Sequence, residues 1–404
     1  MTGDLNRVEG NRIGSDATGM LGLGNDDDGV RVESDENTIT SNLIVDNSDG
    51  VEIAPSATTS EYNVVKSNLI GLNLDQTGSI PNDFNGIVVA NTNNNTIGGT
   101  ADGDGNVIAG HATAGGLQII GTTGYAPTGN VVQGNFIGVN SSLEELPAFS
   151  NLVGIIIMGT AHDNLIGGTA DGAANHVINN TSFGLAVMSV DTLATFPVGN
   201  AVVSNSMFNN GSVDIDLLRD TDGNFFPDAE IGVTPNDVGD PDTGPNDLLN
   251  FPVFSDVSSS EGMVDVTFDL DVDEAVAEYR VEFFASIEID ATGHGPGQTL
   301  LGSTNVSGDV TGQVASLTAP ESLYGETMQI SATVTEVDGS SDGFGSTSEF
   351  SGAEEVEILP PAGFTSSGLA DTGITMMVQI LAVIIATVAA TGALVVKNRY
   401  KVYS

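Results

Sequence analysis

The chain has 404 residues, enough for two or three domains, and carries Asp+Glu 54 against Lys+Arg 9, a formal net charge of −45. Such an acidic chain repels nucleic acid and anionic lipid, so we expect no nucleic-acid partner. It contains no Cys, which excludes disulfides and thiolate metal sites. Its 51 glycines are typical of a β protein dense in turns, and an aromatic content of 5% is low for a surface on which sugars stack.

A repeated pair of Asn-x-[Ile/Val] tripeptides runs through the N-terminal half. The seven pairs begin at Asn6/Asn11, Asn37/Asn42, Asn63/Asn68, Asn95/Asn106, Asn130/Asn135, Asn164/Asn175 and Asn200/Asn205. Six of them follow an apolar strand that begins at Gly29, Gly50, Gly86, Gly116, Gly154 or Gly184. One unit is therefore Gly-strand, turn, Asn-strand, turn, Asn-strand, at the period of a solenoid. Three short strands per unit predict one triangular coil of a parallel β-helix, with Asn amides stacked at the corners.

Two of the seven pairs are spaced by eleven residues, whereas the others are spaced by five. Both long pairs carry the same insert, Ile-Gly-Gly-Thr-Ala-Asp-Gly, at residues 97–103 and 166–172. A coil accepts such an insert at a corner, where it lengthens a turn without disturbing the strands. The first pair lacks its Gly-strand and no signal peptide precedes it, so we expect a truncated N-terminus.

The repeats predict a β-helix over residues 1–213. The next segment, 214–248, is rich in Asp and Pro and predicts an extended acidic connector. Within it, Asp220, Asp222 and Asn224 alternate as oxygen ligands that suit Ca²⁺, the one cofactor that the sequence suggests. The match to an EF-hand loop is poor, because the Gly falls one place early and no Glu closes the loop. A calcium site and a solvated acidic turn are both open interpretations.

Residues 249–358 return to β patterning without the Asn repeat. Five segments alternate apolar and polar residues between Gly, Ser and Asp turns, at 263–270, 279–285, 299–306, 312–317 and 327–336. This spacing is typical of an Ig-like β-sandwich. Residues 359–373, with Pro, Ser and Gly, predict a tether.

The C-terminal end carries a membrane-spanning pattern. Residues 374–396 bear no charge and only Gln379 is strongly polar, so at ~1.5 Å per residue they predict a helix that covers the ~30 Å hydrocarbon core. The tail 397–404 follows at once with two Lys and one Arg. The positive-inside rule therefore predicts a cytoplasmic C-terminus and an extracellular location for everything before residue 374.

A pentapeptide stands directly before this span: Leu369, Ala370, Asp371, Thr372 and Gly373. Together with the apolar span and the basic tail it resembles a Gram-positive cell-wall sorting signal, in a variant with Ala in place of Pro. The resemblance implies that a sortase-like transpeptidase cleaves between Thr372 and Gly373 and joins Thr372 to the cell envelope. A plain single-pass membrane anchor is the alternative interpretation.

The Asn-x-Ile-Gly-Gly-Thr repeats resemble those of bacterial right-handed parallel β-helix surface proteins, whose architecture is shared with pectate lyases. Residues 234–246 with the Asn-Phe-Pro at 250–252 are similar to the junction in such proteins, and residues 281–285 with 293–302 are similar to their C-terminal module. The resemblance implies an all-β fold, with a right-handed parallel β-helix, an Ig-like β-sandwich and one C-terminal transmembrane helix. It implies a cell-surface location, but it does not imply a reaction.

Candidate catalytic groups are sparse. Pectate-lyase chemistry needs calcium ligands and a base, and the only basic residues that the β-helix offers are Arg7, Arg12, Arg31 and Lys66. A glycosidase needs paired carboxylates on one face. Consecutive carboxylates at 26–28 sit on a predicted turn and point in different directions, which favours solvation.

The four histidines form no metal motif. His111, His162 and His176 are scattered through the repeats without the spacing of metal ligands. The Gly-His-Gly at 293–295 resembles a tripeptide of polygalacturonases, but it lies outside the coils and is expected to be a turn.

These patterns favour a non-catalytic rod anchored at the cell surface, in an adhesin, coat or display role. We expect it to bind a carbohydrate or a surface protein through contacts spread over coil turns. The alternative is a polysaccharide-acting enzyme, a lyase or glycoside hydrolase of the β-helix type. Two carboxylates converging within about 10 Å beside a groove favour the enzyme, whereas an unbroken ladder surface favours the rod.

Overall fold

The computed structural model describes residues 1–56, 59–190, 193, 195–220, 232–273, 276–338 and 343–364, with Asp220 described by its backbone alone. The chain divides into a compact unit Met1–Leu359 and a second unit Pro360–Ser404. The sorting pentapeptide, the predicted span 374–396, the basic tail and the predicted calcium ligands Asp222 and Asn224 lie outside the described residues. Within the described residues, no helix has the length and apolar character that a membrane crossing requires.

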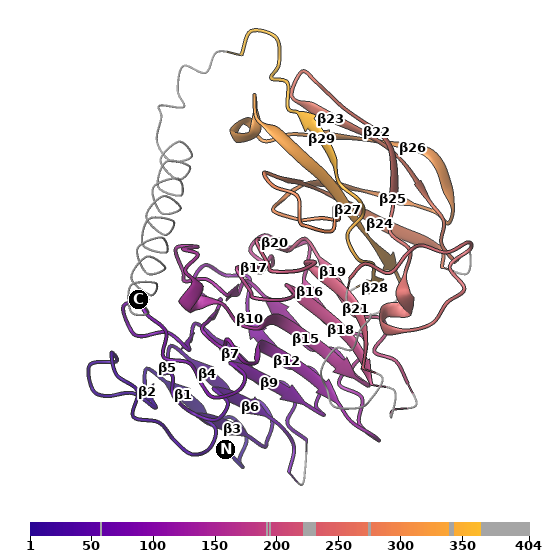
Figure 1. Cartoon of the computed structure of the whole chain (residues 1–404). Helices are drawn as coiled ribbons and strands as arrows, with labels where there is room; N and C mark the ends of the chain where they lie inside the picture. Colours follow the sequence, from indigo (N-terminus) through magenta and orange to yellow (C-terminus); the bar gives the residue numbers. More distant parts are fainter. Residues whose placement is uncertain are drawn as a thin grey trace, which may run out of the picture. The chain divides into compact units, whose positions relative to one another are not determined.

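Three parallel sheets of seven strands each form the N-terminal half, and Figure 1 shows their strands as successive parallel rungs. The first sheet contains β1 (Arg7–Glu9), β4 (Thr38–Thr40), β7 (Val64–Lys66), β10 (Thr96–Gly98), β13 (Val131–Gln133), β16 (Leu165–Gly167) and β19 (Ala201–Val203). The second contains β2 (Arg12–Ile13), β5 (Leu43–Ile44), β8 (Leu69–Ile70), β11 (Val107–Ile108), β14 (Phe136–Ile137), β17 (His176–Ile178) and β20 (Ser206–Phe208). The third contains β3 (Val30–Val32), β6 (Val51–Ile53), β9 (Ile87–Ala90), β12 (Gly115–Gly121), β15 (Val153–Gly159), β18 (Leu185–Val190) and β21 (Ile215–Asp220). This arrangement is that of a parallel β-helix, as the repeats predict.

The register of these sheets places similar residues next to one another in successive coils. In the first sheet, Ile39 pairs with Val65 and Val65 with Ile97, and all three are fully buried. Parallel strands in register line up the inward side chains of successive coils, so each coil adds the same apolar layer. Burying one Ile or Val side chain stabilises the fold by about 1.5–3 kcal/mol.

The Asn pairs form two amide ladders along the β-helix. At each step the backbone N–H and the side-chain Nδ2 of one Asn donate to Oδ1 of the Asn in the next coil; Asn37 donates to Asn63 at 2.8 and 3.1 Å. One ladder joins Asn6, Asn37, Asn63, Asn95, Asn130, Asn164 and Asn200. The other joins Asn11, Asn42, Asn68, Asn106, Asn135, Asn175 and Asn205. The predicted stacking of Asn amides is therefore observed.

The strand-leading glycines stack for a steric reason. A Cβ added at Gly50 would lie 2.4 Å from the carbonyl oxygen of Gly86, and one added at Gly154 would lie 2.4 Å from that of Gly184. Each Gly is needed because the backbone of the following coil occupies the space of its side chain.

Two antiparallel sheets follow, which we call the antiparallel module (residues 253–357). One contains β22 (Val253–Ser260), β23 (Met263–Leu270) and β26 (Val310–Thr318). The other contains β25 (Thr299–Val306), β24 (Glu278–Ser286), β27 (Thr327–Val337), β28 (Phe344–Thr347) and β29 (Glu354–Glu357). The five predicted segments coincide with β23 to β27, and their inward side chains form one apolar cluster that includes Phe268 and Phe283.

The antiparallel module closes the last coil of the β-helix. It accepts hydrogen bonds from five backbone N–H groups of that coil: Gly199 to Ser346, Val202 to Thr347, Ser204 to Glu282, Met207 to Gly297 and Leu217 to Glu349. Phe284 and Phe350 of the module pack into the same apolar cluster as the helix core. An end coil needs such a cover, because its N–H groups would otherwise be buried without acceptors.

The segment predicted as a connector differs from expectation at two places. Strand β21 lies inside it, so the third sheet extends past residue 213, and Leu217 is buried in the helix core. Asn246, in the short 3₁₀ helix η2 (Pro245–Leu248), accepts from the N–H of Asn200 at 3.0 Å and extends the first Asn ladder by one step. The other 3₁₀ helices among the described residues are η1 (Pro147–Phe149) and η3 (Glu321–Leu323).

Candidate functional site

A cluster of carboxylates gathers around Arg31 on the outer face of the first coils. The Arg31 guanidinium binds Asp28 at 3.1 Å, Glu33 at 3.2 Å and also Glu52, which β6 places beside it through the pairing of Arg31 with Glu52. Asp28 comes from the acidic turn at 26–28, of which the other two members are exposed. Of the three predicted turn carboxylates, one therefore turns toward a partner.

The chemistry of this cluster is that of an ion-pair network. Burial, and then a hydrogen bond with Asp28, raises the pKa of Glu52 to about 7, while Arg31 opposes the rise. Asp28 and Glu52 both accept from the same Arg31 nitrogen, Nη1, so this cation holds their two carboxyl groups.

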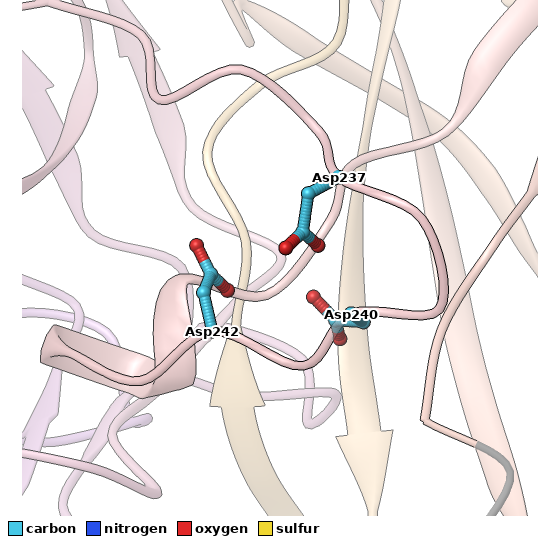
Figure 2. A group of neighbouring side chains, drawn as sticks. All are labelled: Asp237, Asp240 and Asp242. Atoms are coloured by element: carbon cyan, nitrogen blue, oxygen red, sulfur yellow. The ribbon is translucent and has the colours of Figure 1, made fainter.

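A second acidic group lies in the segment between β21 and β22. Figure 2 shows the side chains of Asp237, Asp240 and Asp242 converging, and one oxygen from each lies within 4.8 Å of the others. Asn250 holds the loop, because its Oδ1 accepts from the N–H of Asp237 at 3.0 Å and its own N–H donates to Asp240 at 3.1 Å. Among the described residues this is the one group of three His, Asp or Glu side chains close enough to share a metal ion.

The electrostatics of this triad favour a shared proton or a hard cation. Burial, followed by the negative charges of Asp242 and Asp237, raises the pKa of Asp240 to about 7. Burial and the charge of Asp237 also raise the pKa of Asp242, while Arg219 lowers it. Oxygen-only ligands of this kind suit Ca²⁺ or Mg²⁺. The three side chains are half-buried, and Oδ1 of Asp237 and Oδ1 of Asp242 are buried without a hydrogen-bond partner among the described residues.

The structure does not bring the histidines together. His162 binds the neighbouring Asp163 at 2.7 Å on the surface, and His176 stacks on Phe136 with ring centroids 5.3 Å apart. His294, of the Gly-His-Gly tripeptide, lies between β24 and β25, where its Nδ1 is 3.0 Å from the carbonyl oxygen of Phe350.

His111 belongs to a third polar ladder that sequence reasoning missed. The ladder joins Asn47, Asn82, His111, Asn151, Asn180 and Asn210. The Nε2 atom of His111 accepts from Asn82 at 3.1 Å and its Nδ1 donates to Asn151 at 3.0 Å, so a neutral ring replaces an Asn amide. Burial lowers its pKa to about 4. Each ladder residue stands three to five positions before a strand-leading residue, and this uneven spacing hid the pattern.

An open hollow of about 410 Å³ lies between the second insert and β25. Its lining combines small insert residues such as Thr169 and Ala170 with Ser204, Ser206 and the backbone around Gln298. Its lining residues include no aromatic ring other than that of His176, so it lacks the broad stacking surface of a sugar-binding site.

Searches against protein-family models and against curated proteins find no match for this sequence.

Proposed function

We propose that the chain is a non-catalytic rod, held at the cell surface, that presents a binding face in an adhesin, coat or display role. One observation carries the proposal: the two Asn ladders and the apolar layers repeat in every described coil. A coil that serves as a structural repeat keeps the same interior throughout, and its outer face is left to make contacts. We further propose that the coils are right-handed and that the antiparallel module is Ig-like.

The acidic exterior supports a display role. A net charge of −45 keeps rods apart and in solution, and it limits binding to partners that tolerate or complement negative charge. A carbohydrate or a surface protein is the partner that we propose, with contacts spread over successive coil turns.

Anchoring is the part of the proposal that one experiment tests most directly. The full chain is expressed in a Gram-positive host, and the cell-wall, membrane and secreted fractions are compared for the wild type and for the double variant Leu369→Ala with Thr372→Ala. Sortase processing through Thr372 places the wild type in the wall fraction and leaves the variant in the membrane fraction. Wall attachment that persists in the variant would contradict sortase processing through Thr372, whereas a wild type found in the membrane fraction would favour a plain span over residues 374–396.

Enzymatic activity is tested at the carboxylate cluster around Arg31. The full chain is incubated with a panel of polysaccharides, with and without calcium, and new reducing ends or unsaturated products are assayed. Binding without turnover supports the rod. Turnover that disappears in Glu52→Gln and persists in Glu61→Gln, a change at a carboxylate outside the cluster, would establish the polysaccharide-acting alternative.

A further inference from the structure

A small cavity lies where the last coil of the β-helix meets the antiparallel module. Its volume is about 150 Å³. It is lined from the coil by Asn209, Asn210, Ser212 and Asp214, and from the loop between β24 and β25 by Glu288, Ile289, Asp290 and Pro296. Of these eight described residues three are acidic and none is basic, so the lining gathers negative charge without a protein cation.

Asp214 occupies a special place in the repeat. Leu185 pairs with Ile215, so Asp214 stands where the six preceding coils carry their strand-leading glycine. At Gly184 a side chain is excluded, because its Cβ would lie 2.7 Å from the carbonyl oxygen of Asp214. Strand β21 is the end strand of its sheet, so this obstruction is lifted and the position holds a carboxylate that reaches the cavity.

Two carboxylate oxygens at this cavity lack partners. Asp214 is 3% exposed; its Oδ1 accepts from Asn210 Nδ2 at 2.6 Å, whereas its Oδ2 is buried with no hydrogen-bond partner among the described residues. Asp290 matches it, since Oδ1 accepts from the N–H of Thr292 at 2.6 Å and the buried Oδ2 has no partner in the described part of the chain. Buried oxygens of this kind are unfavourable unless a donor or a cation satisfies them.

We propose that this cavity is a calcium site, which we call the junction site, with Asp214 Oδ2 and Asp290 Oδ2 as its charged ligands. Calcium takes six to eight oxygens at about 2.3–2.6 Å in irregular geometry, and the remaining positions fall to side-chain oxygens of Asn209 or Ser212 and to water. A cavity of about 150 Å³ admits the ion together with several waters. Mg²⁺ demands a more regular octahedron than this mixed lining offers.

The consequence is mechanical. Asp214 belongs to the last coil and Asp290 to the module loop, so a shared ion ties that loop to the end of the β-helix. Calcium then stabilises the junction in addition to the hydrogen bonds that close the last coil. The junction site is separate from the triad of Asp237, Asp240 and Asp242, whose side chains are half-buried.

The test measures calcium binding and its location on the EDTA-treated full chain in detergent. Titration calorimetry with Ca²⁺ and with Mg²⁺ at constant ionic strength is combined with hydrogen exchange of the loop 287–297. We expect a calcium dissociation constant on the order of 10⁻⁴ M, slower exchange of the loop in calcium, and at least about tenfold weaker calcium binding in Asp214→Asn and Asp290→Asn.

The controls separate this site from other acidic groups. Asp171→Asn removes an exposed carboxylate, and Asp240→Asn changes the triad; both variants are expected to keep calcium-dependent protection of the loop. Asp290→Asn alters only the module loop, so the test stands even if Asp214→Asn fails to fold. The proposal would be overturned if calcium did not change the hydrogen exchange of the loop, or if Mg²⁺ slowed it equally. It would also be overturned if Asp290→Asn bound calcium as tightly as the wild type. An Asp214→Asn chain that is as stable in EDTA as the wild type is in calcium would also overturn the proposal. The cavity would then hold a protonated carboxyl group and not an ion.

Discussion

The backbone N–H of Leu217 donates to Glu349 Oε1 at 2.9 Å, and this bond joins the last strand of the β-helix to the antiparallel module. Glu349 Oε2 accepts in turn from the N–H of Thr234 at 2.7 Å, and the side chain is 1% exposed. One carboxyl group therefore satisfies two backbone donors that come from segments far apart in the sequence.

Replacing Glu349 should loosen this junction. Glu349→Ala leaves both N–H groups without an acceptor, so we expect the free energy of unfolding to fall by about 3 kcal/mol. Glu349→Gln keeps an acceptor oxygen and should lose about 1 kcal/mol. Burial raises the pKa of Glu349 to about 8, so the neutral amide also matches its charge at pH 7. Urea unfolding followed by circular dichroism measures the effect. The exposed Glu354→Ala is the control, and equal midpoints for Glu349→Ala and Glu354→Ala would contradict the prediction.

The amide ladders should be sensitive at any inner rung. Asn135 donates to Asn175 at 2.9 Å and accepts from Asn106 at 2.9 Å, and it is fully buried. Asn135→Ala breaks both steps and leaves buried polar groups unpaired, so we expect a loss of at least about 3 kcal/mol in the free energy of unfolding. Asn305→Ala, at an exposed position of β25, should change it by less than about 0.5 kcal/mol. Similar denaturation curves for the two variants would show that the ladder is not stabilising.

His111 should make stability depend on pH below neutrality. Its pKa in the folded chain is lowered by burial to about 4 from the usual 6.5. Between these values the unfolded chain binds more protons, so this contribution is complete above pH 6.5 and is lost as the pH falls toward 4, by roughly 3 kcal/mol in total.

The comparison with His111→Asn isolates this contribution. An Asn continues the amide ladder without titrating, so the difference in unfolding free energy between wild type and variant should change with pH across the 6.5-to-4 range. His162→Asn, at the surface, is the matched control. A difference that stays constant from pH 7 to pH 4 would contradict a neutral buried His111.

The insert that two coils share allows a test of how closely its backbone packs against the next coil. Gly98 has φ +90° and an added Cβ would lie 1.9 Å from the carbonyl oxygen of Gln133. Gly167 in the second insert has φ +88° and would meet the carbonyl oxygen of Val203 at 2.1 Å. Gly98→Ala and Gly167→Ala should therefore each destabilise the fold by about 3 kcal/mol or more.

Gly103, in the same insert as Gly98, distinguishes the cost of backbone strain from the cost of a steric clash. It has φ +79° but nothing within 4 Å of an added Cβ, so Gly103→Ala should lose only about 1 kcal/mol. Thermal unfolding of the three alanine variants measures the order. Equal losses at Gly98 and Gly103 would show that the backbone conformation, and not the neighbouring coil, decides the effect.

Periodic features of the fold were predictable from the sequence. The inward Ile and Val residues and the two Asn ladders recur in phase because each coil meets its neighbour through the same local contacts. Strands β23 and β25 of the antiparallel module have the bounds that the sequence predicts, since their alternation and flanking turns are local signals as well. The segment of β21 carries apolar residues too, but its Asp content suggested a connector.

The aperiodic features were decided by the tertiary structure alone. The third ladder contains a His in place of one Asn and uneven spacing, so no repeat marks it. Asn246 completes an Asn ladder from outside the repeats, and Glu349 meets Leu217 across 132 residues. Asp214 and Asp290 share a cavity although neither lies in a recognisable ligand motif. Such contacts arise where the end of the solenoid meets a different fold, because two unlike surfaces meet once, and a contact made once leaves no repeating pattern in the sequence.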